Sequence, residues 1–273
     1  MPNDLAGPIE LFHFLFLAAL PPAEKGFAVL KGGGNLRFFF RSPRYSQDLD
    51  FDVPYASPES VQSAMTRALK SPPLLDGLRA HRIQIAEQTL GKQTDVTQRW
   101  RIALELRLEA SNTVHQPART KIEFSHRPEL MDYLNDRQVD YVRDDIAARY
   151  SRRPPQALHY NATAAILQKL RALTERNIVQ SRDVWYLEML FREHPSNHVS
   201  ERLNAGVFGD DAQRNRVLND AIALIYELDF SAYQRQVVAF LDDGYADQYD
   251  KSNSWDHIQF SVVSAIERLR SGR

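Results

Sequence analysis

Residues 100–108 alternate strictly between apolar and charged side chains, and this pattern constrains the fold more than any other feature of the sequence. The apolar positions are Trp100, Ile102, Leu104, Leu106 and Leu108, and the charged positions around them are Arg99, Arg101, Glu105, Arg107 and Glu109. Because successive side chains of a strand point to opposite faces, this period of two predicts a half-buried strand with one wet face. Further strands are expected at 27–30, 49–53, 82–88 and 120–125. About five such strands predict a mostly antiparallel or mixed sheet that helices cover on one face.

Two of the helices expected in the first half of the chain have clear local signals. The run at 11–20 is apolar apart from His13, and no positive charge precedes it. Its ten residues are too few to span a bilayer, which takes roughly 20, so we expect a buried N-terminal helix and no membrane partner. The second helix is expected from Ser57 to Lys70, because a capping hydroxyl, a proline and an acid open it. Pro72 and Pro73 are expected to end it.

The second half of the chain is predicted to be nearly all helix, because its apolar residues recur at helical spacing. In the last segment these residues are Ile258, Val262, Ala265, Ile266 and Leu269. We expect helices at about 160–176, 182–194, 198–205, 210–228, 231–241 and 255–271. Residues 149–156, which include two prolines and several arginines, are interpreted as a linker. The predicted class is therefore α+β, with a mixed-sheet domain at 1–150 followed by an all-helical domain at 157–273.

Composition excludes several classes of protein. The chain has 273 residues, and its 43% apolar content is enough to build a core. Its 34 basic and 35 acidic residues give a formal net charge of −1, which excludes a globally basic nucleic-acid coat protein but not a local basic surface. The absence of cysteine excludes disulfides, thiolate zinc sites and thiol catalysis. It also fits a cytoplasmic protein, which is the location we expect.

The residues best suited to ligand binding and catalysis are concentrated at 27–53. A Gly32-Gly33-Gly34 triplet follows a predicted strand, a short helical run is expected at 35–40, and Ser46-Gln-Asp48-Leu-Asp50 opens the next strand. Glycines allow the backbone to turn sharply and to approach a ligand. Their amides, followed by a helix N-terminus, favour binding of phosphate oxygens, and the Ser46 hydroxyl is expected to contact the same phosphates. The combination is more specific than a glycine pair alone.

Asp48 and Asp50 lie two positions apart on the predicted strand, so their side chains point to the same face. At an effective dielectric constant near 20 and a separation of about 5 Å, each like-charge pair costs roughly 3 kcal/mol. A divalent cation removes this repulsion, and hard oxygen ligands favour Mg²⁺ or Mn²⁺. The alternative is that Asp48, Asp50 and Asp52 form the wet face of an edge strand. Glu123 is the candidate third carboxylate on a neighbouring strand, with Glu105 as the alternative.

These motifs resemble those of the nucleotidyltransferase superfamily, and most closely those of the AbiEii-type nucleotidyltransferase toxins. The first element is Gly32-Gly33-Gly34-Asn35-Leu36, followed by Arg44-Tyr-Ser46-Gln-Asp48-Leu-Asp50-Phe51. The second is Lys169-Leu-Arg-Ala172-Leu173-Thr-Glu-Arg176, followed by Arg182-Asp183. The resemblance implies a sheet domain with a C-terminal helical domain. It also implies that an antitoxin is encoded alongside and that tRNA is the acceptor of the transferred nucleotide.

By this resemblance the catalytic roles fall on Ser46, Asp48, Lys169 and Asp183. The residues that would bind the nucleoside triphosphate are Gly32, Gly33, Gly34, Ser46 and Lys169. From the chemistry of phosphoryl transfer we expect Asp48, Asp50 and Glu123 to bind Mg²⁺ or Mn²⁺, with an NTP as substrate. Lys169 would neutralise charge that builds up on the phosphates. Without the resemblance, Lys169 and Arg176 look like the wet side of a helix, and Arg182-Asp183 like a charge pair at a helix start.

One position departs from the family pattern. Family members commonly continue Arg-Asp-x-x-Asp, whereas this chain has Tyr186 at the second acidic place. This leaves open a nucleotide-binding protein that has lost catalysis. A nucleotidyltransferase acting on a small molecule or a protein is a further alternative. The arginines at 99, 101 and 107 share one strand face, where they either follow a phosphate backbone or serve as ordinary solubilising charge.

Overall fold

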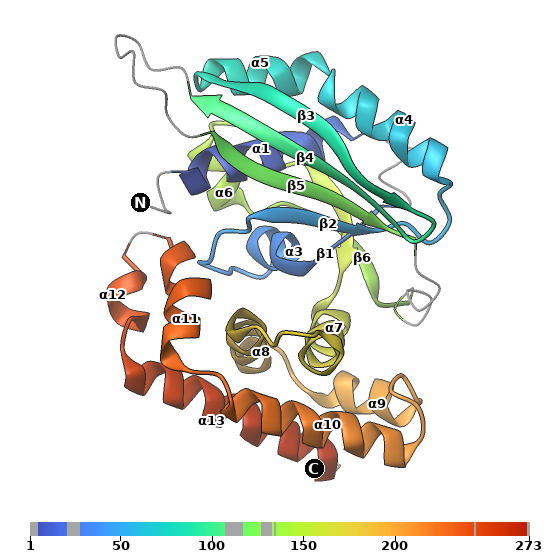
Figure 1. The fold of residues 1–273 in the computed structure, drawn as a ribbon, viewed down its shortest axis with the longest axis vertical. Coiled ribbons are helices and arrows are strands. Elements are labelled where there is room, and N and C mark those ends of the chain that lie inside the picture. Colours follow the sequence, from blue (N-terminus) through green and yellow to red (C-terminus); the bar gives the residue numbers. More distant parts are fainter. Residues whose placement is uncertain are drawn as a thin grey trace. The chain divides into compact units, whose positions relative to one another are not determined.

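The computed structural model describes residues 5–20, 28–106, 117–126, 133, 135–242 and 244–271. The chain divides into two compact units. The first comprises Met1–Arg41 and Tyr45–Tyr160, and the second comprises Ser42–Arg44 and Asn161–Arg273. The first unit combines a sheet with helices and the second is helical (Figure 1). The expected α+β class, with a mixed sheet followed by helices, is confirmed.

Within the described residues, the first unit is built on a seven-stranded mixed sheet of order β3-β4-β5-β2-β1-β7-β6. Its strands are β1 (Val29–Lys31), β2 (Asp48–Asp52), β3 (Ile83–Thr94), β4 (Thr97–Leu106), β5 (Ala118–Ser125), β6 (Arg137–Tyr141) and β7 (Gln156–Tyr160). β2 runs parallel to β5, and β1 runs parallel to β7. The other neighbouring pairs are antiparallel. The five expected strands are all present, although Phe27, Arg107 and Leu108 lie outside the described residues.

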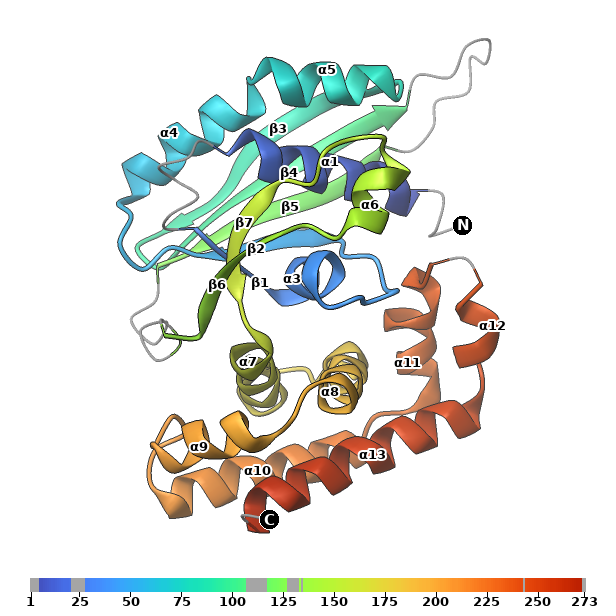
Figure 2. The same ribbon diagram turned by 180° about the vertical axis from the view of Figure 1, so that it is seen from behind.

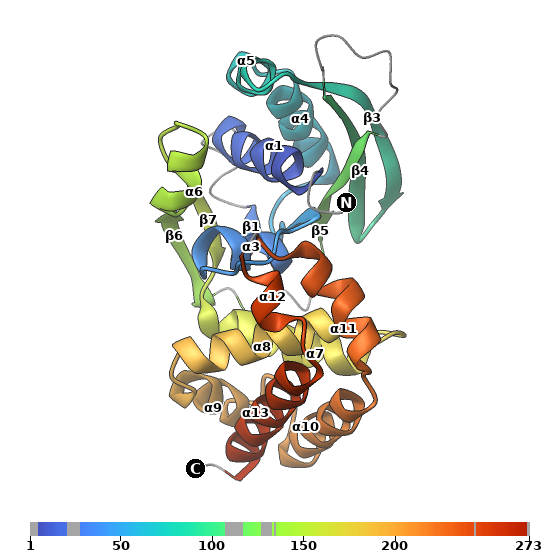
Figure 3. The same ribbon diagram turned by 90° about the vertical axis from the view of Figure 1, so that its left-hand side faces the viewer.

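The alternation in β4 has the expected physical cause. Ile102 and Leu104 are fully buried, whereas Arg101 and Glu105 are exposed. Three helices pack against one another and against the sheet on its apolar side, as Figure 3 shows. They are α1 (Ala6–Ala19), α4 (Pro58–Leu69) and α5 (Pro72–Ala80). Residues 11–17 of α1 are all buried, which confirms the expected buried N-terminal helix.

Two expected boundaries in the first unit were wrong. Pro72 does not merely end the preceding helix: it opens α5, because proline is tolerated in the first turn, where no backbone N–H is needed. Residues 149–156 are not a linker between the units. They connect α6 (Asp144–Arg149) to β7, which begins at Gln156 and pairs with both β1 and β6 (Figure 2). The first unit therefore reaches Tyr160, beyond the expected boundary at 150.

The second unit begins at Asn161, whose side chain caps α7 by accepting the Ala164 N–H. Its helices are α7 (Ala162–Glu175), α8 (Ser181–Glu193), α9 (Asn197–Asn204), α10 (Asp211–Tyr226), α11 (Phe230–Gln236), the 3₁₀ segment η3 (Val238–Phe240), α12 (Ala246–Tyr249) and α13 (Ser252–Ser271). All six expected helices are found within a few residues, except that the segment expected at 231–241 splits into α11 and η3. Among the described residues, none of the helices combines the length and the apolar character that crossing a membrane requires.

Candidate functional site

The glycine triplet forms the first turn of helix α3 (Gly32–Phe39), rather than a turn ahead of the helix as expected. Gly32 has a φ of +67°, in the left-handed region that favours glycine. A Cβ at this position would lie 2.9 Å from the Asp50 Oδ2 atom, so any larger residue would collide with that carboxylate. Within the described part of the chain, no side chain caps this helix N-terminus. Its first backbone amides therefore lie beside Asp50, where they suit phosphate oxygens.

Gly34 has a different role from Gly32. It is buried, and a Cβ there would meet the Leu49 Cδ2 atom at 2.7 Å. Gly34 therefore lets α3 pack closely against β2, which keeps the helix N-terminus next to the carboxylates of that strand. Its assignment to the nucleotide stays a prediction, as do those of Gly32 and Gly33.

Strand register brings the predicted carboxylates to one face of the sheet. Asp48 and Asp50 of β2 pair with Lys121 and Glu123 of β5. Because β2 lies between β5 and β1, the alternative of an exposed edge strand is wrong. Asp52 continues the same face but is fully buried, where it accepts the Tyr160 hydroxyl at 2.9 Å and pairs with Lys31.

Asp48 and Glu123, both predicted metal ligands, lie next to cationic side chains. The Lys121 backbone N–H donates to Asp48 Oδ1 at 3.1 Å, and the Lys121 ammonium lies 3.5 Å from Asp48 Oδ2. The Arg99 Nε donates to Glu123 Oε2 at 2.6 Å. Glu105, the alternative third carboxylate, instead accepts from Gln84 on the exposed face of β4. The register therefore favours Glu123 over Glu105 as the neighbour of Asp50.

A metal ion would have to be held by only a few protein ligands. Among the described residues, no three histidine, aspartate or glutamate side chains are grouped closely enough to form a cage for one. Mg²⁺ is commonly held by one or two carboxylates together with the phosphates of its substrate. Asp48 and Asp50 supply hard oxygen donors of that kind, so the residues fit a metal that arrives with a nucleotide.

The loop that leads into Asp48 is fixed by hydrogen bonds. The Ser46 hydroxyl donates to the Asp48 carbonyl at 2.8 Å, and the Thr120 hydroxyl donates to the Gln47 carbonyl at 2.8 Å. His13 Nε2 lies 2.7 Å from Thr120 Oγ1. Because the Thr120 proton is used on Gln47, the imidazole donates to Thr120. The hydrogen bonds from His13 through Thr120 therefore fix the Gln47 carbonyl just before Asp48, and the Ser46 hydroxyl fixes the Asp48 carbonyl.

A second contact from α1 supports the same loop. Buried Glu10 accepts three hydrogen bonds from Arg37, at 2.7, 2.9 and 3.4 Å. The Arg37 guanidinium lies 4.3 Å from the centre of the Tyr45 ring, and the Tyr45 hydroxyl accepts from Arg149 at 2.7 Å. Sequence reasoning missed both α1 contacts. The available signal was a pair of polar residues, Glu10 and His13, spaced three apart in a helix that is otherwise apolar.

In the helical unit, Lys169 and Asp183 form a buried ion pair. The Lys169 ammonium donates to Asp183 Oδ1 at 2.6 Å, and Arg176 pairs with the other carboxylate oxygen. Asp183 is fully buried. Burial by itself raises the pKa of Asp183, but the Lys169 and Arg176 charges outweigh it, so the pKa lies below its ordinary value of 3.8. The expected wet helix face is wrong for Lys169, which is 8% exposed.

Comparison with protein families matches residues 14–259 to the family described as "Nucleotidyl transferase AbiEii toxin, Type IV TA system". The chain belongs to the AbiEii nucleotidyltransferase toxin family. A comparison with curated proteins gives no match.

Solved structures from Helicobacter pylori share the fold of this AbiEii-family chain. One is a protein proposed to be a nucleotidyltransferase, with 17% identity and a TM-score of 0.58, covering 98% of this chain and 96% of its own. The other is JHP933, with 17% identity and a TM-score of 0.57, covering 99% and 94% respectively. At this level of identity the likeness establishes the fold.

Tyr186, which stands where the resemblance predicts a second acid, is almost completely buried. Its hydroxyl accepts a hydrogen bond from Arg44 Nη1 at 3.0 Å, and the Lys169 ammonium lies 4.9 Å from its ring centre. Arg44 also donates to the Gln236 carbonyl at 2.8 Å. Tyr186 therefore hydrogen-bonds to Arg44, and its ring packs beside the Lys169 ammonium of the Lys169–Asp183 ion pair. Sequence reasoning did not assign Arg44, although it belongs to the first AbiEii element.

Replacing His13 with glutamine is expected to change how stability depends on pH. Burial lowers the pKa of His13 from 6.5 to about 3, so the folded protein holds this imidazole neutral. Its contribution to stability is complete above pH 6.5 and is lost as the pH falls from 6.5 to about 3, at roughly 1.4 kcal/mol per pH unit. Glutamine keeps a donor for Thr120 but does not titrate. The urea midpoint of the wild type should therefore fall more steeply than that of His13→Gln between pH 7 and pH 5; parallel curves would show that the imidazole titrates freely.

Proposed function

We propose that this chain is a Mg²⁺- or Mn²⁺-dependent nucleotidyltransferase that moves a nucleoside monophosphate from an NTP to tRNA and releases pyrophosphate. We further propose that it acts in the cytoplasm as the toxin of a toxin–antitoxin or phage-defence pair. The observation that carries the proposal is the placement of Asp48 and Asp50 on one sheet face, beside the N-terminus of α3 at Gly32. Family membership supports the transfer chemistry and the toxin role.

In this proposal, residues of the first unit bind the triphosphate. The amides at the start of α3 would donate to phosphate oxygens, and the positive end of the helix dipole favours the same anion. Asp48 and Asp50 would hold the metal ion, and Glu123 on the neighbouring strand would take the proton of the attacking hydroxyl. When bound, the metal supplies Lewis-acid stabilisation of charge on the phosphates and on the leaving pyrophosphate. Ser46 holds the loop backbone at Asp48 and would offer its hydroxyl oxygen to the nucleotide.

The second unit supplies a fixed positive charge. Lys169 would neutralise negative charge that develops on the phosphates. Asp183 is too deeply buried to meet a substrate, so we assign it as the residue that orients Lys169. The family's description as a type IV toxin–antitoxin system supports a cognate antitoxin as the protein partner.

A labelling assay tests the proposed function. Purified protein and Mg²⁺ would be incubated with total tRNA and each of the four α-³²P-labelled NTPs in turn. The expected result is label on tRNA with one preferred NTP and release of unlabelled pyrophosphate. Label on a protein or a small molecule would overturn the tRNA acceptor and keep the transfer reaction. Absence of label with every NTP would overturn the reaction, and calorimetric NTP binding would then favour a protein that binds nucleotide without turnover.

A further inference from the structure

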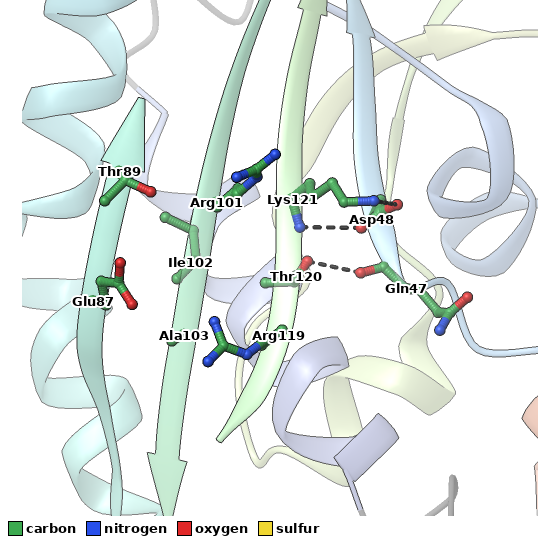
Figure 4. Close-up of a pocket in the computed structure, with 10 residues that line it drawn as sticks. All are labelled: Gln47, Asp48, Glu87, Thr89, Arg101, Ile102, Ala103, Arg119, Thr120 and Lys121. Atoms are coloured by element: carbon green, nitrogen blue, oxygen red, sulfur yellow. Dashed lines mark hydrogen bonds and ion pairs between the residues drawn. The ribbon is translucent and has the colours of Figure 1, made fainter. Parts of the chain in front are cut away.

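The wet face of the sheet carries a groove of about 470 Å³ next to Asp48 (Figure 4). It crosses four neighbouring strands, β2, β5, β4 and β3. Its lining residues are Gln47, Asp48, Glu87, Thr89, Arg101, Ile102, Ala103, Arg119, Thr120 and Lys121. Since neighbouring strands lie about 4.8 Å apart, the groove extends roughly 14 Å from the Asp48 strand to the Glu87 strand. That length exceeds what a single phosphate group occupies.

Two arginines in this groove, Arg101 and Arg119, are exposed. Among the described residues, neither of them makes a side-chain hydrogen bond or an ion pair. They differ in this from Arg99, which shares a strand face with Arg101 but is engaged by Glu123. An unengaged guanidinium offers a planar set of N–H donors that matches phosphate oxygens.

The backbone of β3 makes room for one of these arginines. Gly91 lies beside Arg101, and a Cβ at position 91 would meet the Arg101 Nε at 3.1 Å and its Cγ and Cδ at 3.4 Å. The Arg101 side chain therefore lies across β3 at a position where a larger residue would displace it. In Figure 4 Arg101 and Arg119 project from adjacent strands, with Lys121 directed toward Asp48.

The charges of the groove favour an anion. Three cationic side chains, Arg101, Arg119 and Lys121, face two acids, Asp48 and Glu87. Lys121 already neutralises Asp48, which leaves the two arginines against Glu87. The part of the groove away from the Lys121–Asp48 ion pair therefore carries a net positive charge.

We propose that this groove binds the phosphodiester backbone of a polynucleotide acceptor and leads its reactive end to Asp48. The inference rests on the proposed function, because it places the acceptor of that same reaction. A polynucleotide fits better than the NTP for two reasons. The triphosphate already has the start of α3 beside Asp50, and a strand with a phosphate at every nucleotide can engage both arginines at once.

Binding of a fluorescein-labelled 12-nucleotide single-stranded RNA tests the groove, measured by fluorescence anisotropy between 50 and 300 mM NaCl. Each phosphate contact contributes about 0.7 to the slope of log K against log salt for a single strand. Arg101→Gln with Arg119→Gln should therefore lower the slope by about 1.4, which is about 25-fold weaker binding at 0.1 M salt. Glu87→Gln should tighten binding, since it removes the acid that faces the arginines.

Arg79→Gln serves as the matched control, because Arg79 is exposed on α5 of the same unit and pairs with the neighbouring Asp76. It should leave both affinity and slope unchanged. Equal RNA binding by the wild type and the double variant would overturn the groove, as would displacement of the RNA by an NTP at concentrations that saturate the nucleotide site. These outcomes are separate from failure of the proposed function, which would appear as arginine-dependent RNA binding without label transfer.

Discussion

Asp48→Asn is expected to abolish nucleotidyl transfer while the fold stays intact. Asparagine has the same shape and keeps an oxygen for the Lys121 backbone N–H, but it removes the negative charge that would hold the metal ion. A metal ion contributes several kcal/mol to transition-state stabilisation, and a loss of about 4 kcal/mol corresponds to roughly a thousandfold in rate. Transfer of label from α-³²P NTP to the acceptor measures the effect directly.

The fold of Asp48→Asn should be close to that of the wild type. The Asp48 side chain is 36% exposed, and an exposed ion pair such as the one with Lys121 contributes about 0–1 kcal/mol. Its thermal midpoint should accordingly move by only a few degrees. Asp76→Asn is the matched control, since Asp76 is an exposed aspartate on α5 of the same unit. Full activity in Asp48→Asn would show that this carboxylate is not a metal ligand.

Asp183→Asn is expected to destabilise the helical unit strongly and to reduce transfer as well. The substitution leaves the buried Lys169 ammonium without its counterion, whereas the exposed Arg176 is hydrated by solvent. Removing one partner of a buried ion pair typically costs about 3–5 kcal/mol. Urea unfolding should show a large fall in the midpoint of the variant.

Lys169→Met separates the catalytic role from the structural one. In this variant Asp183 keeps Arg176 as its partner, so the loss of stability should be smaller than in Asp183→Asn. Transfer should nevertheless fall at least as far, mainly in kcat, because the charge that stabilises the transition state is gone. If the Lys169→Met protein keeps the wild-type kcat, Lys169 and Asp183 serve only to hold α7 against α8 and take no part in transfer.

The pH dependence gives an independent check on Asp183. Because the pKa of Asp183 is lowered in the folded state, the carboxylate contributes stability above its ordinary pKa of 3.8, and that stability is lost as the pH falls below it. The wild type should therefore lose stability on acidification below about pH 4 more steeply than Asp183→Asn. Equal acid profiles would show that the pair does not hold the carboxylate ionised.

Local sequence patterns anticipated the elements of the fold well where periodicity is strong. The alternation in β4 and the helical spacing of α13 each reflect burial of one face, and burial of one face is a local property of the sequence. The short strands β6 and β7 were missed; β6 buries none of its five residues, so no alternation of buried apolar side chains marks it. Pro72 was predicted only to end a helix, but proline is also favoured in the first turn of a helix, and here it opens α5.

The residues of the candidate site were predicted from the sequence, but the contacts that support them were not, and their roles in phosphate and metal binding stay a prediction. Residue types and spacing identified Gly32, Asp48 and Asp50, because glycines at a helix start followed by two acids on one strand face are typical of phosphate and metal binding. The relay from His13 to Gln47 was not foreseeable, since it joins α1 to β5 across 107 positions of sequence.

The sequence alone determined the α+β class, the positions of most helices and strands, and the membership of Asp48 and Asp50 in one strand face. These follow from periods of two and 3.6 residues, which each segment carries within itself. Only the tertiary structure decided that β2 lies inside the sheet, that Glu123 rather than Glu105 neighbours Asp50, and that Lys169 and Asp183 are paired. Those outcomes depend on which strands and helices meet, and long-range pairing is set by the packing of the whole unit rather than by local spacing.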